Sequence, residues 1–473
     1  MQENARRYTG NSFVIRRSEI EGRIDPHQYH FDRLNAIEKI KRNRKILKLK
    51  EVVKSKKTVV TEIKGTDVYI GLENIASDTG SYLPTTAKQS ISSAGVFKKG
   101  QILFPKLRPY LNKIYLAEFD GLCSTEFHIL ESTHFNSEFL SIYLRSELIV
   151  NQTKHLMTGN TLPRLQTEDI NNLPVPDISL ELQKDIVEYY RTKSLEAKDK
   201  ENAALGLLRS IDIYILEELG IVVPERKSSI NDRIFTALFS DVTGNRFDPK
   251  LYDNSTKALQ LAIAESPFPK IPLKKLIVHS ASGDWGEDDN FSNPNDYVRC
   301  LVIRATEFDN TGNLKLDNSR VKHRLINTEK LKRIDIRVND LLIEKSGGSP
   351  DQPVGRVALL TEEILQSEEI CYSNFIHKIR VNEATIHAEY LFHFLKAVYN
   401  MKLTDAMQSQ TNGIRNLIFH DYFRQLIVFP THQAQEKILR HISDLYVKAN
   451  ILKSEATNLL ALAKSEVVRM IIG

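Results

Sequence analysis

The stretch that decides the fold is residues 432–472, HQAQEKILRHISDLYVKANILKSEATNLLALAKSEVVRMII. Its apolar residues alternate spacings of four and three, and Glu466 fills the single gap. They are Ile438, Ile442, Leu445, Ala449, Leu452, Ala456, Leu459, Ala463 and Met470. A seven-residue apolar period without Pro or Gly predicts a long helix that lays one narrow stripe on a partner helix. At 1.5 Å per residue, about 40 residues would span roughly 60 Å.

The partner helix lies 252 positions earlier in the same chain. Lys193 and Lys200 weaken the apolar pattern there, and Glu218 ends it. The matched positions are Ile186, Tyr190, Lys193, Ala197, Lys200, Ala204, Leu207, Ile211, Tyr214 and Glu218. The start of the helix repeats as well, since Gln183 corresponds to Gln435. The chain is therefore interpreted as a tandem duplication in which each half is a globular region followed by a long helix.

A short motif, R-[IF]-D-P-x-x-Y, opens each half at residues 23–29 and 246–252. Its proline restricts the preceding aspartate to an extended conformation, which is typical of a turn. We interpret the motif as a structural fixture, with direct contact to a partner as the alternative.

Strand patterns dominate the globular regions, and their turns indicate antiparallel connections rather than βαβ repeats. The sequence therefore predicts an α+β fold with four segments, at 1–176, 177–224, 225–430 and 431–473. Predicted strands in the two halves pair as 49–53 with 273–277, 68–75 with 301–307, 102–104 with 341–343, and 123–130 with 371–381.

Composition is that of an ordinary globular protein, with 473 residues, 41% hydrophobic and 26% charged. No stretch approaches the roughly 18 apolar residues of a membrane helix, and no signal peptide is evident. Three widely separated cysteines, Cys123, Cys300 and Cys371, fit a reducing cytoplasm. The net charge of +5 permits a polyanionic partner without demanding one.

Catalytic motifs are missing from the sequence. It contains no GxxxxGK[ST] or GxGxxG loop and no methyltransferase signature. Asp177, Glu181 and Lys184 resemble a nuclease carboxylate motif only faintly, because their spacing is wrong. The acidic residues around Trp285 are interpreted as an exposed loop, with cation binding as the alternative. The thirteen histidines show no metal-ligand spacing. We therefore expect neither a resident metal nor an enzyme.

Polar loops, in contrast, carry side chains suited to reading DNA. Arginine and lysine can pair with guanine edges, and asparagine and glutamine with adenine. The candidate DNA-binding residues are Lys106, Arg108, Asn112, Lys113, Asn160 and Arg164 in the first half, and Lys345, Gln410, Asn412 and Arg415 in the second. The alternative for Arg164 and Arg415 is structural, because they recur at matched positions in the two halves and would brace each loop against the helix that follows. Ten basic residues between 39 and 57 form either a solvated helix face or a phosphate-tracking patch.

The pattern of these segments resembles the specificity subunit of Type I restriction-modification enzymes. The resemblance is carried by residues 97–113 (FKKGQILFPKLRPYLNK), by 119–127 (FDGLCSTEF), and by 159–183 with LPVP at 173–176 and Gln183. The second half keeps the closing pattern of Gly413, Arg415, Asp421, Pro430 and Gln435 but lacks the LRPY loop. The resemblance covers nearly the whole chain.

The resemblance implies two target-recognition domains joined by two antiparallel helices, which form a coiled-coil spacer in a pseudo-two-fold tandem repeat. It implies a non-catalytic subunit that binds an asymmetric, bipartite site in double-stranded DNA. Its partners would be two methyltransferase subunits, which carry S-adenosylmethionine, and motor-nuclease subunits, which use ATP and Mg²⁺.

Two alternatives stay open from the sequence. The chain could serve a related phage-defence or fused restriction system, which genomic neighbours would reveal. It could also be a coiled-coil scaffold without any role on DNA, and the base-suited loops argue against that.

Overall fold

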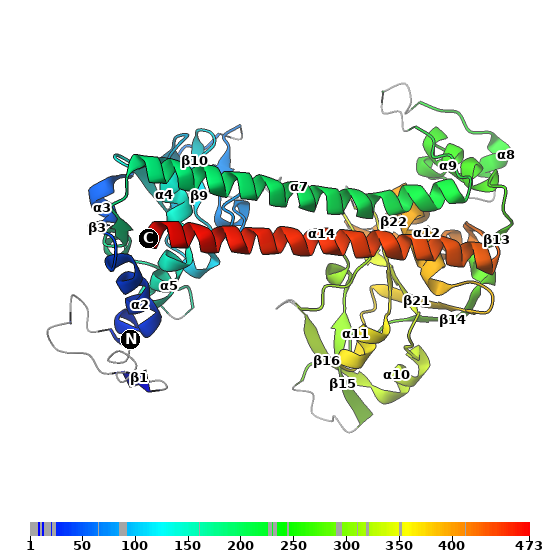
Figure 1. Ribbon diagram of the computed structural model, residues 1–473. Coiled ribbons are helices and arrows are strands. Elements are labelled where there is room, and N and C mark those ends of the chain that lie inside the picture. Colours follow the sequence, from blue (N-terminus) through cyan, green and yellow to red (C-terminus); the bar gives the residue numbers. More distant parts are fainter. Residues whose placement is uncertain are drawn as a thin grey trace. The chain divides into compact units, whose positions relative to one another are not determined.

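The computed structural model describes residues 8–9, 12–13, 20, 25–64, 66–84, 92–159, 161–225, 229, 234–243, 246–289, 296–309, 311–317, 321–349, 352–411 and 413–473. Contacts divide the chain into two compact units. Unit 1 is residues 1–201 with 453–473, and unit 2 is residues 202–452. Each long helix, α7 (Leu180–Glu218) and α14 (His432–Ile472), runs without interruption and contributes one part to each unit (Figure 1). A unit is thus a globular domain together with its share of both helices.

Unit 1 contains two four-stranded sheets, ordered β5-β7-β10-β6 and β4-β11-β8-β9, and a small β12-β3 pair. All pairings in them are antiparallel except β10 with β6. The strands are β3 (Ile46–Lys48), β4 (Val53–Lys56), β5 (Val59–Val60), β6 (Tyr69–Ile70), β7 (Ala94–Phe97), β8 (Ile102–Pro105), β9 (Tyr115–Leu116), β10 (Gly121–Cys123), β11 (Phe127–Ser132) and β12 (Pro174–Pro176). A further pair, β1 (Tyr8–Thr9) with β2 (Ser12–Phe13), precedes them.

Short helices accompany these sheets. They are η2 (Pro26–Tyr29), α2 (Phe31–Lys41), α3 (Leu49–Val52), η3 (Leu72–Asn74), η4 (Pro109–Leu111), α4 (Ser137–Leu144), α5 (Glu147–Leu156) and α6 (Thr167–Asn171). Helix α4 is buried along most of its length because six of its eight residues, among them Phe139 and Tyr143, enter the core.

Unit 2 repeats this plan. Its sheet β14-β21-β17-β19 corresponds to β4-β11-β8-β9, and its β13-β24 pair corresponds to β12-β3. The strands are β13 (Lys270–Pro272), β14 (Ile277–Ser282), β15 (Tyr297–Ile303), β16 (Lys322–Asn327), β17 (Leu341–Glu344), β18 (Ser346–Gly347), β19 (Val357–Leu359), β20 (Ile370–Tyr372), β21 (Ile376–Val381), β22 (Gln408–Thr411), β23 (Ile414–Leu417) and β24 (Leu426–Val428). Parallel pairing again occurs once, between β15 and β20. The predicted α+β fold and the duplication are confirmed.

The helices of unit 2 complete the plan. They are α8 (Phe239–Val242), η6 (Pro249–Leu251), α9 (Asn254–Ala264), η7 (Leu273–Lys275), η9 (Ala305–Glu307), α10 (Thr328–Ile334), α11 (Glu362–Ser367), α12 (Ala388–Asn400), η10 (Leu403–Met407) and α13 (Phe419–Arg424). None of the helices in the described part of the chain is long and apolar enough to cross a membrane.

Three of the paired strand predictions are wrong in detail. Residues 68–75 and 301–307 were expected to be strands, but β6 ends at Ile70 and β15 at Ile303, and the short helices η3 and η9 follow. Residues 49–53 and 273–277 were expected to be first strands, but each begins with a helical turn, α3 or η7, between two strands. Residues 123–130 and 371–381 were each expected to be one strand, but both are broken by a turn. The turn sends β10 and β11, and likewise β20 and β21, into different sheets. A run of apolar residues does not reveal this break, because both strands are buried.

The predicted apolar seam is confirmed within each unit. In unit 1, Ile186 of α7 shares a core with Val467 and Ile471 of α14. In unit 2, Ile211 of α7 shares a core with Ile438 and Ile442 of α14. The beginning of one helix thus packs on the end of the other, so the two helices are antiparallel. Seam alanines are almost completely buried at Ala197, Ala204, Ala449, Ala456 and Ala463. Lys200, which weakens the apolar pattern, pairs with Glu455 of α14 at 2.6 Å.

A buried glutamine opens each long helix and holds the neighbouring domain helix. The Gln183 side chain accepts a hydrogen bond from the Asn136 N–H (2.8 Å) and donates one to the Ile178 carbonyl (3.1 Å). The Gln435 side chain accepts from the His387 N–H (3.0 Å) and donates to the Pro430 carbonyl (2.9 Å). The matched glutamines of the sequence are therefore clamps between each domain and its helix.

Replacing Gln435 by methionine should destabilise unit 2 by about 2–4 kcal/mol, because two buried backbone groups lose their partners at about 1–3 kcal/mol each. Urea unfolding followed by circular dichroism measures this loss. The exposed neighbour Gln433 is the matched control, and Gln433→Met should change stability by less than about 0.5 kcal/mol. Equal effects of the two substitutions would refute the clamp.

Candidate nucleic-acid interface

In unit 2, two loops that are distant in sequence meet in one small sheet, β18-β23-β22. Strand β18 follows directly on β17, and β22 and β23 form a hairpin after η10. Gly347 of β18 lies opposite Arg415 of β23, which in turn lies opposite Gln410 of β22. Three of the predicted DNA-binding residues of this half, Lys345, Gln410 and Arg415, are thus brought together.

In unit 1, the corresponding loops meet in the same way. Arg164 forms β-bridges with both Leu107 and Thr158. The Arg108 N–H donates to the Pro163 carbonyl at 2.9 Å, and the Leu165 N–H donates to the Lys106 carbonyl at 2.9 Å. The loop after β8 and the loop after α5 therefore form one surface, as the equivalent loops do in unit 2.

The strand register corrects one expectation from the sequence. The Leu417 N–H donates to the Lys345 carbonyl at 2.8 Å, as Leu165 does to Lys106, so Leu165 corresponds to Leu417. Arg164 then corresponds to Asn416, and Arg415 occupies the position of Pro163. The two arginines are not matched, contrary to the prediction. Because neighbouring residues of a strand point to opposite faces, the two arginines face opposite ways in their domains.

Arg164 is held by a carboxylate. Its guanidinium donates to both oxygens of Glu126, at 3.1 and 2.8 Å, and this pair lowers the pKa of Glu126. The structural role proposed for Arg164 is thus supported by its geometry. The Glu126 carbonyl accepts from Lys106 N–H as the Phe375 carbonyl does from Lys345 N–H, so Phe375 occupies the corresponding place in unit 2.

Arg415 has different surroundings. No acidic side chain of the described residues pairs with its half-buried guanidinium. It lines a hollow of about 420 Å³ together with Arg246, Gln408 and Gln410. Arg415 and the exposed Gln410 are groups that can read base edges, whereas Gln408 is buried and Asp248 and Asp405 also line the hollow.

The repeated R-[IF]-D-P-x-x-Y motif supports this hollow. The Arg246 guanidinium donates to the carbonyls of Ala406 (2.6 Å) and Gln408 (3.3 Å). The Tyr252 hydroxyl donates to the Arg246 carbonyl at 2.7 Å. The motif aspartate accepts a hydrogen bond from the backbone N–H two residues later in both halves. The Lys250 N–H donates to Asp248 at 3.1 Å, and the His27 N–H donates to Asp25 at 3.0 Å. These bonds support the interpretation of the motif as a structural fixture. Arg23 lies outside the described residues.

A cluster of lysine, histidine and serine recurs near both loops, and no sequence pattern predicted it. In unit 1, the His128 imidazole lies 3.1 Å from the Ser55 hydroxyl, and in unit 2 the His377 imidazole lies 2.6 Å from the Ser280 hydroxyl. Burial lowers the pKa of His128, and lowers that of His377 to about 4, with Lys106 or Lys345 as the second cause. Each imidazole is therefore neutral at pH 7.

The other predicted residues divide into exposed and engaged ones. Arg108 is exposed, with a left-handed backbone (φ 48°). Asn112 is only 4% exposed, and its amide donates to Asp78 (3.0 Å) and to the Arg145 carbonyl (2.9 Å). The Lys113 ammonium donates to the Leu72 carbonyl at 2.9 Å. Asn112 and Lys113 thus hold the loop in place. Asn160 and Asn412 lie outside the described residues.

Several residues of the basic stretch at 39–57 make structural contacts. The Arg44 guanidinium donates to the Ile471 carbonyl (3.1 Å), and the Asn43 amide donates to the Ile472 carbonyl (3.1 Å), so both cap the last turn of α14. Lys56 pairs with Glu131 at 3.1 Å. Other lysines of the stretch, such as Lys39, Lys41 and Lys54, are exposed and leave a basic face on unit 1.

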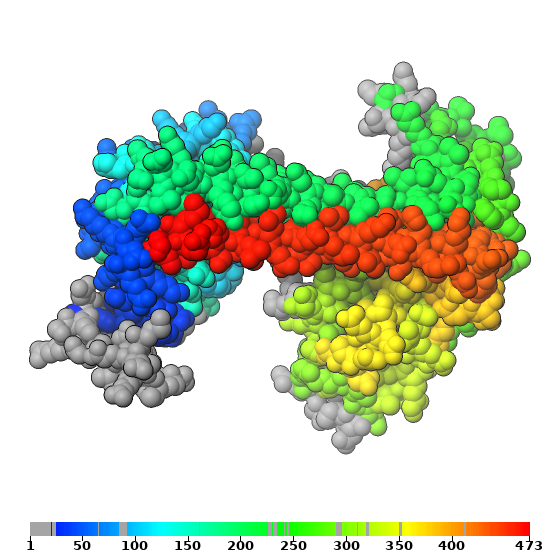
Figure 2. Space-filling model, in the orientation of Figure 1, coloured from blue at the N-terminus to red at the C-terminus, as the bar shows by residue number. Residues whose placement is uncertain are grey.

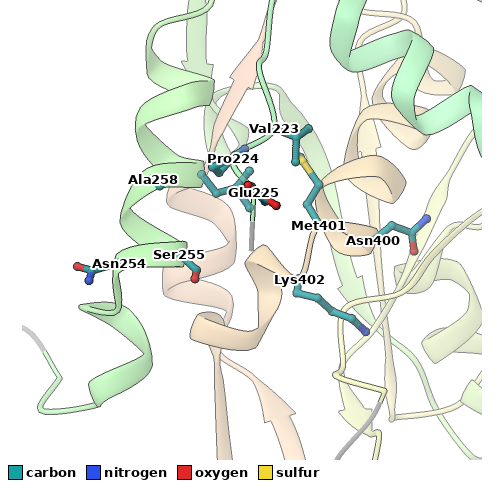
Figure 3. Close-up of a pocket in the computed structure, with 10 residues that line it drawn as sticks. Val223, Pro224, Glu225, Asn254, Ser255, Ala258, Asn400, Met401 and Lys402 are labelled. Atoms are coloured by element: carbon teal, nitrogen blue, oxygen red, sulfur yellow. The ribbon is translucent and has the colours of Figure 1, made fainter. Parts of the chain in front are cut away.

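The acidic loop and a cavity of unit 2 lie away from these recognition loops. Asp284 pairs with Lys330, Asp288 with Arg324 and Asp289 with Arg299. These ion pairs neutralise the acids around Trp285, and the interpretation as a surface loop is preferred to a cation site. A cavity of about 670 Å³ lies among residues 223–225, α9 and the end of α12 (Figure 3). Its lining holds one acid, Glu225, and one base, Lys402, without a cluster of titratable groups.

Comparisons with known proteins agree with this architecture. A family model described as "Type I restriction modification DNA specificity domain" matches residues 276–461. The specificity subunit of the Type I restriction enzyme EcoDI from Escherichia coli is 30% identical over 123 residues. That match covers 25% of this chain, and only 28% of the length of the curated relative.

Three solved structures are similar to this chain at low sequence identity. The HsdS subunit from Thermoanaerobacter tengcongensis is 17% identical, with a TM-score of 0.34, over 91% of this chain and 96% of that one. The Type-I restriction-modification system S subunit from M. genitalium is 14% identical, with a TM-score of 0.37, over 91% and 96%. A chain from a study of complex assembly in the type I R-M system is 16% identical, with a TM-score of 0.46, over 91% and 97%.

Most of the matched residues, 276–452, lie in unit 2, and unit 1 repeats its sheets, its glutamine clamp and its converging loops. This part of the chain is therefore similar to the DNA specificity domain of Type I restriction-modification systems.

Proposed function

We propose that this chain is the non-catalytic subunit that selects the DNA sequence for a Type I restriction-modification complex. Each unit would read one part of an asymmetric, bipartite site in double-stranded DNA. The observation that carries the proposal is the convergence of the same two loops in both units, on the same framework but with different side chains. A repeated framework with different loops suits two different short sequences separated by a fixed gap.

The chemistry of the loops supports contact with DNA. Gln410 is exposed on β22 and Arg415 lies opposite it, so an arginine and an amide project from one hairpin. Lys106 and Lys345 lie at equivalent places beside a neutral histidine, where each can contact phosphate. The net charge of only +5 is modest for a DNA-binding protein. We therefore expect weak binding by the chain alone and stronger binding within the complex.

The long helices would serve as spacer and docking surface. Both are uninterrupted, and their outward sides lie at the surface of each unit (Figure 2). Apolar side chains remain exposed there, at Leu195, Leu205, Ile213, Val447, Ile451 and Leu462. Exposed apolar residues along a helix are typical of a protein-binding face. We propose that two methyltransferase subunits and the restriction subunits dock on the chain, and that they bring S-adenosylmethionine, ATP and Mg²⁺. The free thiols fit an assembly in the cytoplasm.

Long-read methylation mapping tests the proposed function directly. Cells that express this chain with its neighbouring methyltransferase should show a new methylated motif in two parts with a fixed gap, and cells without the chain should not. A soluble, partner-bound chain that leaves the methylation pattern unchanged would contradict the proposal. That result would favour a scaffold or a defence complex that does not methylate DNA.

Arg415→Ala should relax one base position in one part of the methylated motif and leave the other part intact. A guanidinium that reads a base edge contributes about 1–3 kcal/mol of discrimination. Arg164→Ala is the matched control, because Glu126 already holds that guanidinium, and the motif should not change. A uniform loss of methylation with the motif intact would show that Arg415 contacts phosphate and does not read sequence.

Deleting one heptad from each helix, residues 197–203 and 452–458, should shorten the gap and leave both parts of the motif unchanged. The Lys200–Glu455 pair places these two segments side by side. Seven residues remove about 10 Å of helix, the length of up to about three base pairs. Mapping of the methylated motif measures the gap. A folded, active variant that keeps the original gap would contradict the proposal that the helices set the distance between the two parts of the motif.

A further inference from the structure

Two histidines and one aspartate come together in unit 1, outside the recognition loops. His155 is far in sequence from His30 and Asp32. His30 precedes α2, Asp32 lies in its first turn, and His155 lies in the last turn of α5. One ligand atom from each of the three side chains lies within 4.8 Å of the others. Helices α2 and α5 lie next to one another in Figure 1 and are in contact. The spacing of histidines in the sequence did not reveal this group, because only the packing of the two helices brings it together.

From this geometry we infer that His30, Asp32 and His155 form a binding site for a transition-metal ion such as Zn²⁺. This inference goes beyond the proposed reading of DNA and does not depend on it. Two imidazoles and one carboxylate suit Zn²⁺, whereas Mg²⁺ and Ca²⁺ prefer sites made of oxygen atoms.

The distances between the three ligands support the inference. A carboxylate oxygen of Asp32 lies 3.5 Å from the His155 Nε2 atom and 3.8 Å from the His30 Nδ1 atom. Ligand atoms held tetrahedrally about 2.0–2.2 Å from Zn²⁺ lie about 3.3–3.6 Å apart. The two rings are stacked at 15° to one another, so at least one imidazole must rotate out of the stack before both nitrogens face one ion. A fourth position would then stay open for water.

The state of His155 is a second, independent observation. Its side chain is 14% exposed, and its buried Nε2 atom lies 3.5 Å from the Asp32 carboxylate, a distance too long for a well-formed hydrogen bond. A buried polar atom without a partner is costly and rare. A metal ion beside Asp32 would satisfy this atom.

Lys154 competes for the same carboxylate. Its ammonium lies 2.8 Å from the Asp32 oxygen that faces His155, where it neutralises the acid. The Lys154 side chain is about one-third exposed, so it can turn toward solvent when an ion binds. Removal of the Lys154 charge should therefore strengthen metal binding, whereas removal of a ligand side chain should weaken it.

A bound ion would tie the beginning of α2 to the end of α5. The His30 ring caps α2 by accepting a weak hydrogen bond from the Asp32 N–H at 3.2 Å. The His30 and His155 rings stack with their centres 3.8 Å apart. Metal ligation would therefore fix α2 on the core of unit 1.

Titration of the metal-free full-length chain with Zn²⁺, and with Co²⁺ as a spectroscopic probe, tests the site. We expect one ion per chain and the intense visible absorption of tetrahedral Co²⁺. His155→Gln and Asp32→Asn should weaken binding at least tenfold, and Lys154→Met should strengthen it several-fold. Asp32→Asn and Lys154→Met break the same ion pair, so a difference between them reports on metal binding and not on the loss of that pair.

A second histidine pair provides the matched control. The rings of His387 and His432 lie 4.5 Å apart in unit 2, and Glu383 lies 3.6 Å from His387. His387→Gln should leave the stoichiometry and affinity unchanged. Circular dichroism in the presence of a chelator confirms that each variant is folded. Equal Zn²⁺ affinity of the wild type and His155→Gln, or weaker binding by Lys154→Met, would overturn the inference.

Discussion

The packing of α7 against α14 is the interaction on which the rest of the structure depends. Alanines at the centre of the seam, such as Ala204 and Ala449, are completely buried and let the two backbones approach closely. The same helices then complete the domain cores. The end of α14 contributes Val467 and Ile471 to the core of unit 1, and the end of α7 contributes Ile211 and Ile215 to the core of unit 2. Each domain is thus finished by the helix that belongs to the other half of the sequence, and neither half contains a complete core alone.

Duplication explains why the framework is conserved between the units and the loops are not. Gln183 and Gln435 make the same two bonds, and the lysine, histidine and serine cluster recurs at equivalent strand positions. The glutamines and histidines among these groups are buried or half-buried, where a change leaves polar atoms without partners. The loops above them are exposed at Arg108 and Gln410, where a change costs little stability. Under the proposed function, the DNA sequence that each unit reads can therefore change while the scaffold stays the same.

The sequence was most informative where a pattern is local and periodic. The seven-residue period predicted both helices, and the repeated Gln183 and Gln435 located where they begin. The sequence was least informative where tertiary packing determines the position of a strand or the burial of a side chain. The turn between β10 and β11 separates two buried strands, so no change in hydrophobicity marks it. Asn112 resembled a base-reading residue, but it is buried by the packing of its loop on Asp78 and Arg145. His30 and His155 meet only because α2 packs on α5.

The two arginines show how one framework can present different chemistry. Alignment by residue type places Arg164 with Arg415, but backbone hydrogen bonds place Arg164 with Asn416. A shift of one residue along a strand moves a side chain to the opposite face. The surroundings differ accordingly, because Glu126 holds Arg164, whereas Phe375 stands at the corresponding place in unit 2. A charged side chain that is already paired has little to gain from a base edge, since it must first give up its partner. Arg415, on the other face of its strand, has no such carboxylate partner among the described residues, and under the proposed function it is the arginine that this hairpin offers to DNA.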